Sequence, residues 1–158
     1  FLNIGTTTEA VARALLHHRN LTVVTNNINV ANILAESEGC DVIVAGGVLR
    51  RSDGGLVGDL TTEAIGHFKV DYAIVGTSAL DVEGDLLDYD PQEVRVAQAI
   101  LRQARESCLV ADASKLSRRA PVRIASLAAI GRVFTDLPFP PALAARCREW
   151  GCEVILPG

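Results

Sequence analysis

The stretch LTVVTNNINVANILAESEG, residues 21–39, joins a β-type run to a helical run and decides the fold class. Its first five residues are apolar or β-branched, which predicts a buried strand at 21–25. Residues 27–38 then have a helical pattern, which Gly39 closes. A strand followed at once by a helix is the unit from which parallel sheets are built.

The same alternation continues along most of the chain. Further strands are predicted at 41–45, 71–75, 108–111, 132–135 and 152–156, and further helices at 9–18, 59–69, 91–107 and 140–150. The strands are rich in Val, Ile and Leu and are separated by helices. We therefore predict one α/β domain, residues 1–158, with a mostly parallel sheet covered by helices on both faces.

Composition limits the classes of function. The chain has 158 residues, is 49% hydrophobic and carries a formal net charge of −4. It contains neither an apolar run long enough to cross a membrane nor a signal peptide. The acidic balance argues against this segment gripping a nucleic-acid backbone by itself. Because the chain starts with Phe1 and lacks methionine, we expect a fragment of a longer protein whose N-terminal module is missing.

The four cysteines do not indicate a metal site. Cys40, Cys108, Cys147 and Cys152 are scattered, with no C-x-x-C pair and no histidine at a ligand spacing. We interpret them as reduced thiols of a cytoplasmic protein.

Small polar residues follow strand after strand. The strand ends are IGTTT, VTNN, VAGG, IVGTS, VADASK and FTD. In open parallel sheets, ligands bind beyond the carboxyl ends of the strands, beside helix N-termini. Small polar residues after one strand are ordinary turn residues. The same residue types after six successive strands predict the rim of a binding site.

Two of these strand ends are candidates for holding an anion. Gly5-Thr6-Thr7-Thr8 is either a plain helix start with a threonine cap or a phosphate cradle of N–H groups, hydroxyls and a positive helix end. It is not a P-loop, because no G-K-[ST] follows. Lys115 comes directly after a buried strand, from which its ammonium group can reach the same rim.

The other polar positions have structural explanations of their own. Asp90-Pro91-Gln92-Glu93 indicates a capping box, which by itself gives Glu93 no ligand. Thr25-Asn26 and Gly46-Gly47 can each be turn residues. The loop between Gly46 and Asp59 is long for a compact domain, and its glycines would let backbone amides approach a ligand.

Taken together, the motifs resemble a known family. G-T-T-T, T-N, A-G-G-x-L-R, V-G-D, D-Y-A-I-V-G, E-V-R, D-A-S-K and F-T-D are similar, in order and spacing, to the effector-binding domain of DeoR-family transcription regulators. The resemblance spans essentially the whole chain. The stretch LLDYD at 86–90 with EVRV at 93–96 is most similar to the glycerol-3-phosphate regulon repressor branch.

The resemblance implies both a fold and partners. The fold would be the one shared by ribose-5-phosphate isomerase, glucosamine-6-phosphate deaminase and CoA transferases. A winged helix–turn–helix upstream would bind operator DNA, so the full-length protein would be a homodimer or homotetramer matching the symmetry of operator half-sites. The effector would be a phosphorylated sugar or polyol, with glycerol 3-phosphate favoured, and no cofactor is implied.

The resemblance also implies the effector site. Carried over by position, its residues are Asn3, Gly5, Thr6, Thr7, Thr8, Thr25, Asn26, Gly46, Gly47, Gly58, Glu93 and Lys115. Two positions depart from the family pattern: Asn3 stands where an aspartate is usual, and Ala79 replaces a second glycine after Gly76. Because Asn3 lacks the strength of a carboxylate as an acceptor, a small polyol phosphate would suffer less than a hexose phosphate.

Two hypotheses compete with the sensor. An isomerase or deaminase of the same fold would use Glu93 and Asp112 as bases and Lys115 as the electrophilic partner, but no histidine lies near a strand end. A purely structural or oligomerisation module would have no use for a polar rim. We therefore predict a ligand-sensing repressor domain without catalytic residues.

Overall fold

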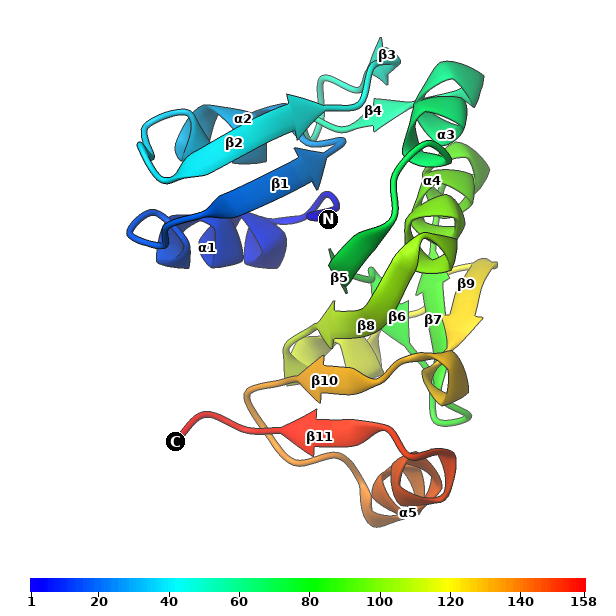
Figure 1. The fold of residues 1–158 in the computed structure, drawn as a ribbon. Coiled ribbons are helices and arrows are strands. Elements are labelled where there is room, and N and C mark those ends of the chain that lie inside the picture. Colours follow the sequence, from blue (N-terminus) through cyan, green and yellow to red (C-terminus); the bar gives the residue numbers. More distant parts are fainter.

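Six parallel strands form the main sheet of the computed structural model, which describes all residues, 1–158 (Figure 1). They are β1 (Leu21–Thr25), β2 (Cys40–Val44), β5 (Val70–Val75), β8 (Ala104–Val110), β10 (Arg132–Phe134) and β11 (Glu153–Ile155). β2 pairs with β1, while β5, β8, β10 and β11 are neighbours in that order. The predicted α/β class is therefore confirmed.

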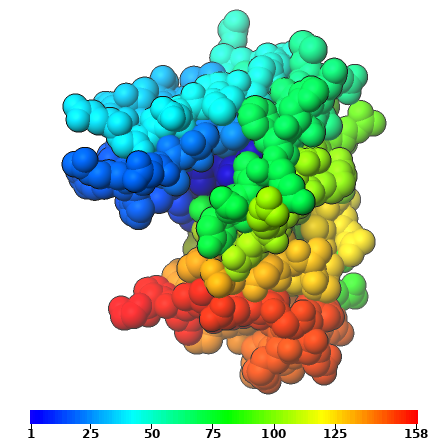
Figure 2. All heavy atoms as spheres, in the orientation of Figure 1, coloured from blue at the N-terminus to red at the C-terminus, as the bar shows by residue number.

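The N-terminal segment joins the two parts of this sheet. Leu2 bridges in parallel to both Thr25 of β1 and Ile74 of β5. Its amide donates to Val24, and the amide of Asn3 donates to Ile74. In Figure 2 the first residues, in dark blue, lie deep between the blue–cyan and green parts of the chain. The segment that ends in Gly5 is thus the middle of the sheet.

Five α-helices connect the strands and pack on both faces. They are α1 (Thr6–Ala14), α2 (Ile28–Leu34), α3 (Asp59–Ile65), α4 (Pro91–Arg102) and α5 (Pro141–Trp150). Val23 packs in a small cluster with α1 and α2, and the next residue, Val24, packs in the main core with residues of α3, α4 and α5. Because successive strand residues point to opposite faces, the two clusters lie on opposite sides of the sheet.

Helical cover is incomplete on the face that carries α1 and α2. Beyond β5, the side chains of Cys108, Phe134 and Ile155 line an open apolar groove beside α1. Phe134 is 40% exposed there. Helices therefore lie on both faces of the sheet, as predicted, but over different strands: α1 and α2 pack on one face beside β1 and β2, and α4 packs on the other beside β5 and β8. None of the helices is both long enough and apolar enough to span a membrane.

Most predicted elements exist, but several boundaries differ. α1 starts at Thr6 and ends at Ala14, whereas the pattern predicts 9–18. α4 ends at Arg102, and β8 already begins at Ala104 instead of residue 108. The ARES segment of β8 is charged and half-exposed, and its Arg105 pairs with Asp71 on β5 at 3.5 Å. Hydrophobic periodicity cannot separate such a polar strand start from the last turns of a helix.

Short antiparallel strands are additions to the predicted elements. A hairpin joins β3 (Val48–Leu49) to β4 (Leu56–Val57) inside the long glycine loop. A second sheet consists of β6 (Ala79–Leu80), β7 (Asp85–Asp88) and β9 (Val122–Ser126) and packs against α4. Two short 3₁₀ helices, η1 (Ala113–Ser117) and η2 (Leu127–Ala129), complete the fold. These elements are too short to show a period, yet they build much of the cavity beside the central strands.

Candidate functional site

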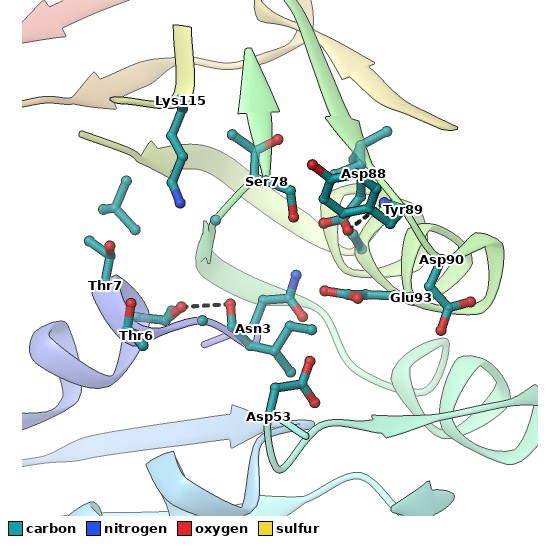
Figure 3. Close-up of a pocket in the computed structure, with 18 of the residues that line it drawn as sticks. Asn3, Thr6, Thr7, Asp53, Ser78, Asp88, Tyr89, Asp90, Glu93 and Lys115 are labelled. Carbon is teal, nitrogen blue, oxygen red and sulfur yellow. Dashed lines mark hydrogen bonds between the residues drawn. The ribbon is translucent and has the colours of Figure 1, made fainter. Parts of the chain in front are cut away.

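A cavity of about 270 Å³ opens beyond the carboxyl ends of the central strands (Figure 3). Its lining residues are Asn3, Ile4, Gly5, Thr6, Thr7, Thr8, Arg50, Asp53, Gly76, Thr77, Ser78, Asp88, Tyr89, Asp90, Glu93, Ala97, Val110, Lys115 and Ile124. One wall comes from the N-terminal segment and the β3–β4 hairpin. The other comes from β7, α4, η1 and the loop after β5. The cavity lies where parallel sheets place their ligands.

One end of the cavity is built to attract an anion. α1 starts at Thr6 directly after Gly5, which has φ of 123°, and no side chain caps this helix start. The first amide groups of a helix point outward and carry partial positive charge. In Figure 3 the ammonium group of Lys115, on η1, points down toward Thr6 and Thr7. Hydroxyls, amides and one cation therefore meet at this end.

Thr8 plays a different part from its two neighbours. Its side chain is fully buried, and its hydroxyl donates to the carbonyl of Ile4 at 2.8 Å. This hydrogen bond fixes the sharp turn from the central strand into α1. Thr6 is exposed and Thr7 half-buried, so these two threonines are the ones placed for a ligand.

The opposite end of the cavity is acidic. Nη1 of Arg50 lies 2.7 Å from Glu93 and 2.8 Å from Asp90, and its Nη2 lies 3.1 Å from Asp53. Arg50 follows β3, whereas Glu93 and Asp90 stand at the start of α4. A fourth carboxylate, Asp88, is 7% exposed and takes part in no ion pair. The acidic end of the cavity thus holds four carboxyl groups and a single cation, the guanidinium of Arg50.

Among the titratable groups that line the cavity, Glu93 has the most strongly shifted pKa. Burial raises the pKa of its carboxyl from 4.5 to about 7, and the charge of Asp88 adds to the rise. The attraction of Arg50 acts in the opposite direction but is outweighed. Glu93 therefore changes charge near neutral pH.

The predicted capping box forms only in part. Asp90 caps α4, because its Oδ1 accepts from the amide of Gln92 at 2.9 Å. Glu93 does not reach back to Asp90; its Oε2 accepts from Arg50 instead. Glu93 thus forms an ion pair with the loop after β3 in place of the local bond that completes a capping box.

Asn3 lies between the two ends. Its side chain is almost fully buried, at 3% exposure, and its Oδ1 has no hydrogen-bond partner. In Figure 3 it stands between Thr6 and Glu93. A buried acceptor without a donor costs free energy, and a ligand hydroxyl in the cavity would satisfy it.

Seven of the twelve predicted site residues line this cavity: Asn3, Gly5, Thr6, Thr7, Thr8, Glu93 and Lys115. The other five, Thr25, Asn26, Gly46, Gly47 and Gly58, do not. The Thr25 hydroxyl donates to Leu2 at 2.7 Å and accepts from the amide of Asn27 at 3.0 Å. The Asn26 amide donates to Leu56 at 3.2 Å. These two residues tie β1 to the central segment and to the hairpin.

The glycines at the end of β2 also have structural roles. The Gly46 carbonyl accepts from the hydroxyl of Thr61 on α3. Gly47 has φ of 147°, and a Cβ atom there would lie 1.8 Å from the Thr61 hydroxyl. Gly58 precedes α3 with φ of 108°. The positive φ angles of Gly47 and Gly58, and the close packing at Gly47, explain glycine at these two positions without a ligand.

The sequence matches a known protein family. Residues 1–137 match the family model described as the DeoR C terminal sensor domain. The chain belongs to this family.

Relatives of this sensor domain are longer proteins. The Escherichia coli K12 protein named glycerol-3-phosphate regulon repressor is 48% identical over 140 residues, which cover 89% of this chain and 56% of that protein. The Haemophilus influenzae protein of the same name is 49% identical over 139 residues, with 87% and 54% covered. The chain thus spans just over half the length of these relatives.

Among solved structures, the domain is similar to ribose 5-phosphate isomerase from Plasmodium falciparum. The TM-score is 0.48 at 16% identity, and the match covers 73% of this chain and 43% of the isomerase.

The sensor domain also places residues in the cavity that the sequence analysis does not assign to it. The main additions are Arg50, Asp53, Ser78, Asp88 and Tyr89. Arg50 stands in the A-G-G-x-L-R motif and Asp53 in the long loop, so a signal was present for both. Their role in the cavity depends on the β3–β4 hairpin and on β7, which have no periodic pattern.

Proposed function

We propose that this domain binds a small phosphorylated metabolite, with glycerol 3-phosphate first, and that binding controls the affinity of the full-length protein for operator DNA. The observation that carries the proposal is the polarity of the cavity. One end holds the uncapped start of α1 and Lys115. Further along lie Asn3 and Glu93, whose side-chain oxygens can accept hydrogen bonds from ligand hydroxyl groups.

The phosphate would lie at the start of α1. Thr6, Thr7 and the helix amides would donate hydrogen bonds to its oxygens, and Lys115 would supply positive charge. Gly5 leaves room for this approach because it has no Cβ atom. The hydroxyl groups of the ligand would then reach Asn3 and the acidic end.

The names of the relatives support the choice of ligand. Two proteins that are nearly half identical to this chain are named glycerol-3-phosphate regulon repressors. Since this chain spans just over half of their length, DNA binding would belong to the remainder of the full-length protein. A dimer or tetramer in the cytoplasm would match operator half-sites. The ligand would act by binding two conformations with different affinity.

Thermal unfolding of the domain with matched ligands tests this proposal. We expect glycerol 3-phosphate to raise the melting temperature and glycerol to leave it unchanged. At about 100 times its dissociation constant, a ligand adds about 2.7 kcal/mol of stability. Glucose 6-phosphate and ribose 5-phosphate, each paired with its free sugar, extend the panel. Equal stabilisation by phosphorylated and free compounds would reject a phosphate site at Gly5–Thr8.

A second candidate, a sugar-phosphate isomerase or deaminase, is favoured by one observation. Glu93 has a pKa of about 7 inside the cavity, which suits a general base. An isomerase would exchange the C2 proton of an aldose phosphate with solvent. Proton NMR of ribose 5-phosphate or glucose 6-phosphate in D₂O with the domain tests this chemistry, and we expect no exchange above the rate without protein.

A further inference from the structure

The two ends of the cavity differ in charge. Lys115 is the only cationic side chain near the start of α1 that lines the cavity. At the other end, four carboxyl groups surround a single cation, Arg50. Figure 3 shows the Asp88 and Glu93 carboxyl groups on the side of the cavity away from Lys115. A ligand that fills the cavity therefore meets positive potential at one end and negative potential at the other.

The positive charge of Arg50 is already shared by three protein carboxylates. Its Nη1 already donates to both Asp90 and Glu93, and its Nη2 lies 3.1 Å from Asp53. A ligand carboxylate that took one of these positions on the guanidinium would displace a protein carboxylate. The displaced group would then be left partly buried without its cation, which is costly.

Asp88 makes this end still less suited to an anion. Its side chain is nearly buried, its Oδ1 accepts from the amide of Tyr89 at 2.7 Å, and it has no ion pair. A second anionic group brought beside Asp88 and Glu93 would meet like charges in a poorly solvated space. Such an arrangement disfavours the charged form of every group involved.

The neutral groups nearby favour hydrogen-bond donors instead. Asn3 presents a buried Oδ1 with no partner. The Thr77 hydroxyl is already used, because it lies 2.8 and 2.9 Å from the Ala79 and Leu87 carbonyl oxygens. Carboxylates accept hydrogen bonds and cannot donate them. A hydroxylated carbon chain supplies the donors that these acceptors need.

We propose that the acidic end makes the site selective for metabolites with a single anionic group. The phosphate lies at α1 and Lys115, and the far end of the ligand is neutral and hydroxylated. Asp88 and Glu93 exclude compounds that carry a carboxylate or a second phosphate there. This inference rests on the proposed function and specifies the class of ligand. Specificity of this kind comes from an unfavourable contact with the wrong compound.

Two compounds of nearly equal size test the proposal. Glycerol 3-phosphate and 3-phosphoglycerate share the phosphate and the middle hydroxyl, and differ in a terminal CH₂OH or carboxylate group. Calorimetric titration of the full-length protein at pH 7.5 should give at least about tenfold weaker binding for 3-phosphoglycerate. Fructose 6-phosphate and fructose 1,6-bisphosphate form a second pair, with the bisphosphate expected to be the weaker ligand.

Variants then assign the selectivity to residues. Asp88→Asn and Glu93→Gln each remove one negative charge while keeping the side-chain shape. We define the selectivity as the affinity for glycerol 3-phosphate divided by the affinity for 3-phosphoglycerate. We expect each variant to lower this ratio at least threefold, chiefly because 3-phosphoglycerate binds more tightly. Asp59→Asn is the matched control, because Asp59 is fully exposed and does not line the cavity. Its ratio should equal that of the wild type.

The outcomes separate this inference from the proposed function. Binding of glycerol 3-phosphate together with equal or tighter binding of 3-phosphoglycerate overturns the selectivity and leaves the phosphate site standing. An unchanged ratio in both cavity variants also overturns the inference, because the carboxylates then exclude nothing. If neither compound nor inorganic phosphate binds, the proposed function and the inference fail together.

Discussion

Arg50 and Glu93 meet across the cavity, with 2.7 Å between Nη1 and Oε2. The arginine belongs to the part of the molecule that contains β3 and β4, and the glutamate belongs to α4. Their side chains are 26% and 12% exposed. This pair, with Asp53 and Asp90, therefore ties the two walls of the cavity together.

Removing Arg50 should destabilise the domain. In Arg50→Ala the carboxylates of Glu93, Asp90 and Asp53 lose their shared cation, and we expect a loss of about 2 kcal/mol in the free energy of unfolding. Urea unfolding monitored by circular dichroism measures it. Arg51→Ala is the control, because Arg51 is exposed and forms no ion pair. If the two variants are equally stable, the network contributes nothing to stability.

Removing Lys115 should weaken ligand binding without unfolding the domain. A charge-assisted hydrogen bond is worth roughly 1.5–3 kcal/mol, so Lys115→Ala should bind glycerol 3-phosphate at least about tenfold more weakly. Calorimetry measures the affinity, and the melting temperature without ligand should stay close to that of the wild type. Arg118→Ala, an exposed position that does not line the cavity, should bind normally. Unchanged affinity in Lys115→Ala would remove this residue from the site.

Glu93 should make stability depend on pH. Its pKa is raised from 4.5 to about 7 in the folded domain, so between these values the folded state binds more protons than the unfolded state. Stability from this group is full below pH 4.5 and is lost as the pH rises through 7. Glu93→Gln removes the effect, so its melting temperature relative to the wild type should rise between roughly pH 5 and pH 8. The opposite trend would mean that Arg50 outweighs burial.

Two neighbouring glycines should respond differently to alanine. Gly47→Ala must hold a side chain at φ of 147° and place its Cβ 1.8 Å from the buried Thr61 hydroxyl. We expect a loss of about 2 kcal/mol or more. A Cβ atom at Gly46 would meet no other atom within 4 Å, and its φ is not positive, so Gly46→Ala should be tolerated. Denaturant unfolding of the two variants decides whether Gly47 is needed for packing.

The parts of the fold with a clear period are predictable from sequence. The predicted start of β1 and the predicted starts of α3 and α4 are correct to the residue, because a buried β-branched run and good N-terminal signals mark them. The rule that ligands bind beyond the strand ends also leads to Gly5–Thr8 and to Lys115, which line one cavity.

The remainder of the site depends on contacts that no local pattern records. Arg50 reaches Glu93 only because the hairpin tip is held against α2, where the Ile28 amide donates to Gly54 at 2.9 Å. Asp88 enters the cavity through β7, which pairs with β9 far along the chain. Thr25 and Asn26 have the right chemistry for a site but use it to hold the backbone. Residue type alone cannot separate these roles.

The position of Leu2 in the middle of the sheet affects how the protein folds during synthesis. Leu2 contacts Thr25 and also Ile74, on a strand that is synthesised much later. The segment around Leu2 therefore stays unpaired on one side until β5 has emerged from the ribosome. Contacts between distant parts of a chain slow folding, and a waiting apolar segment invites aggregation. We expect the sheet to close late, with this segment as the piece that most needs protection during synthesis.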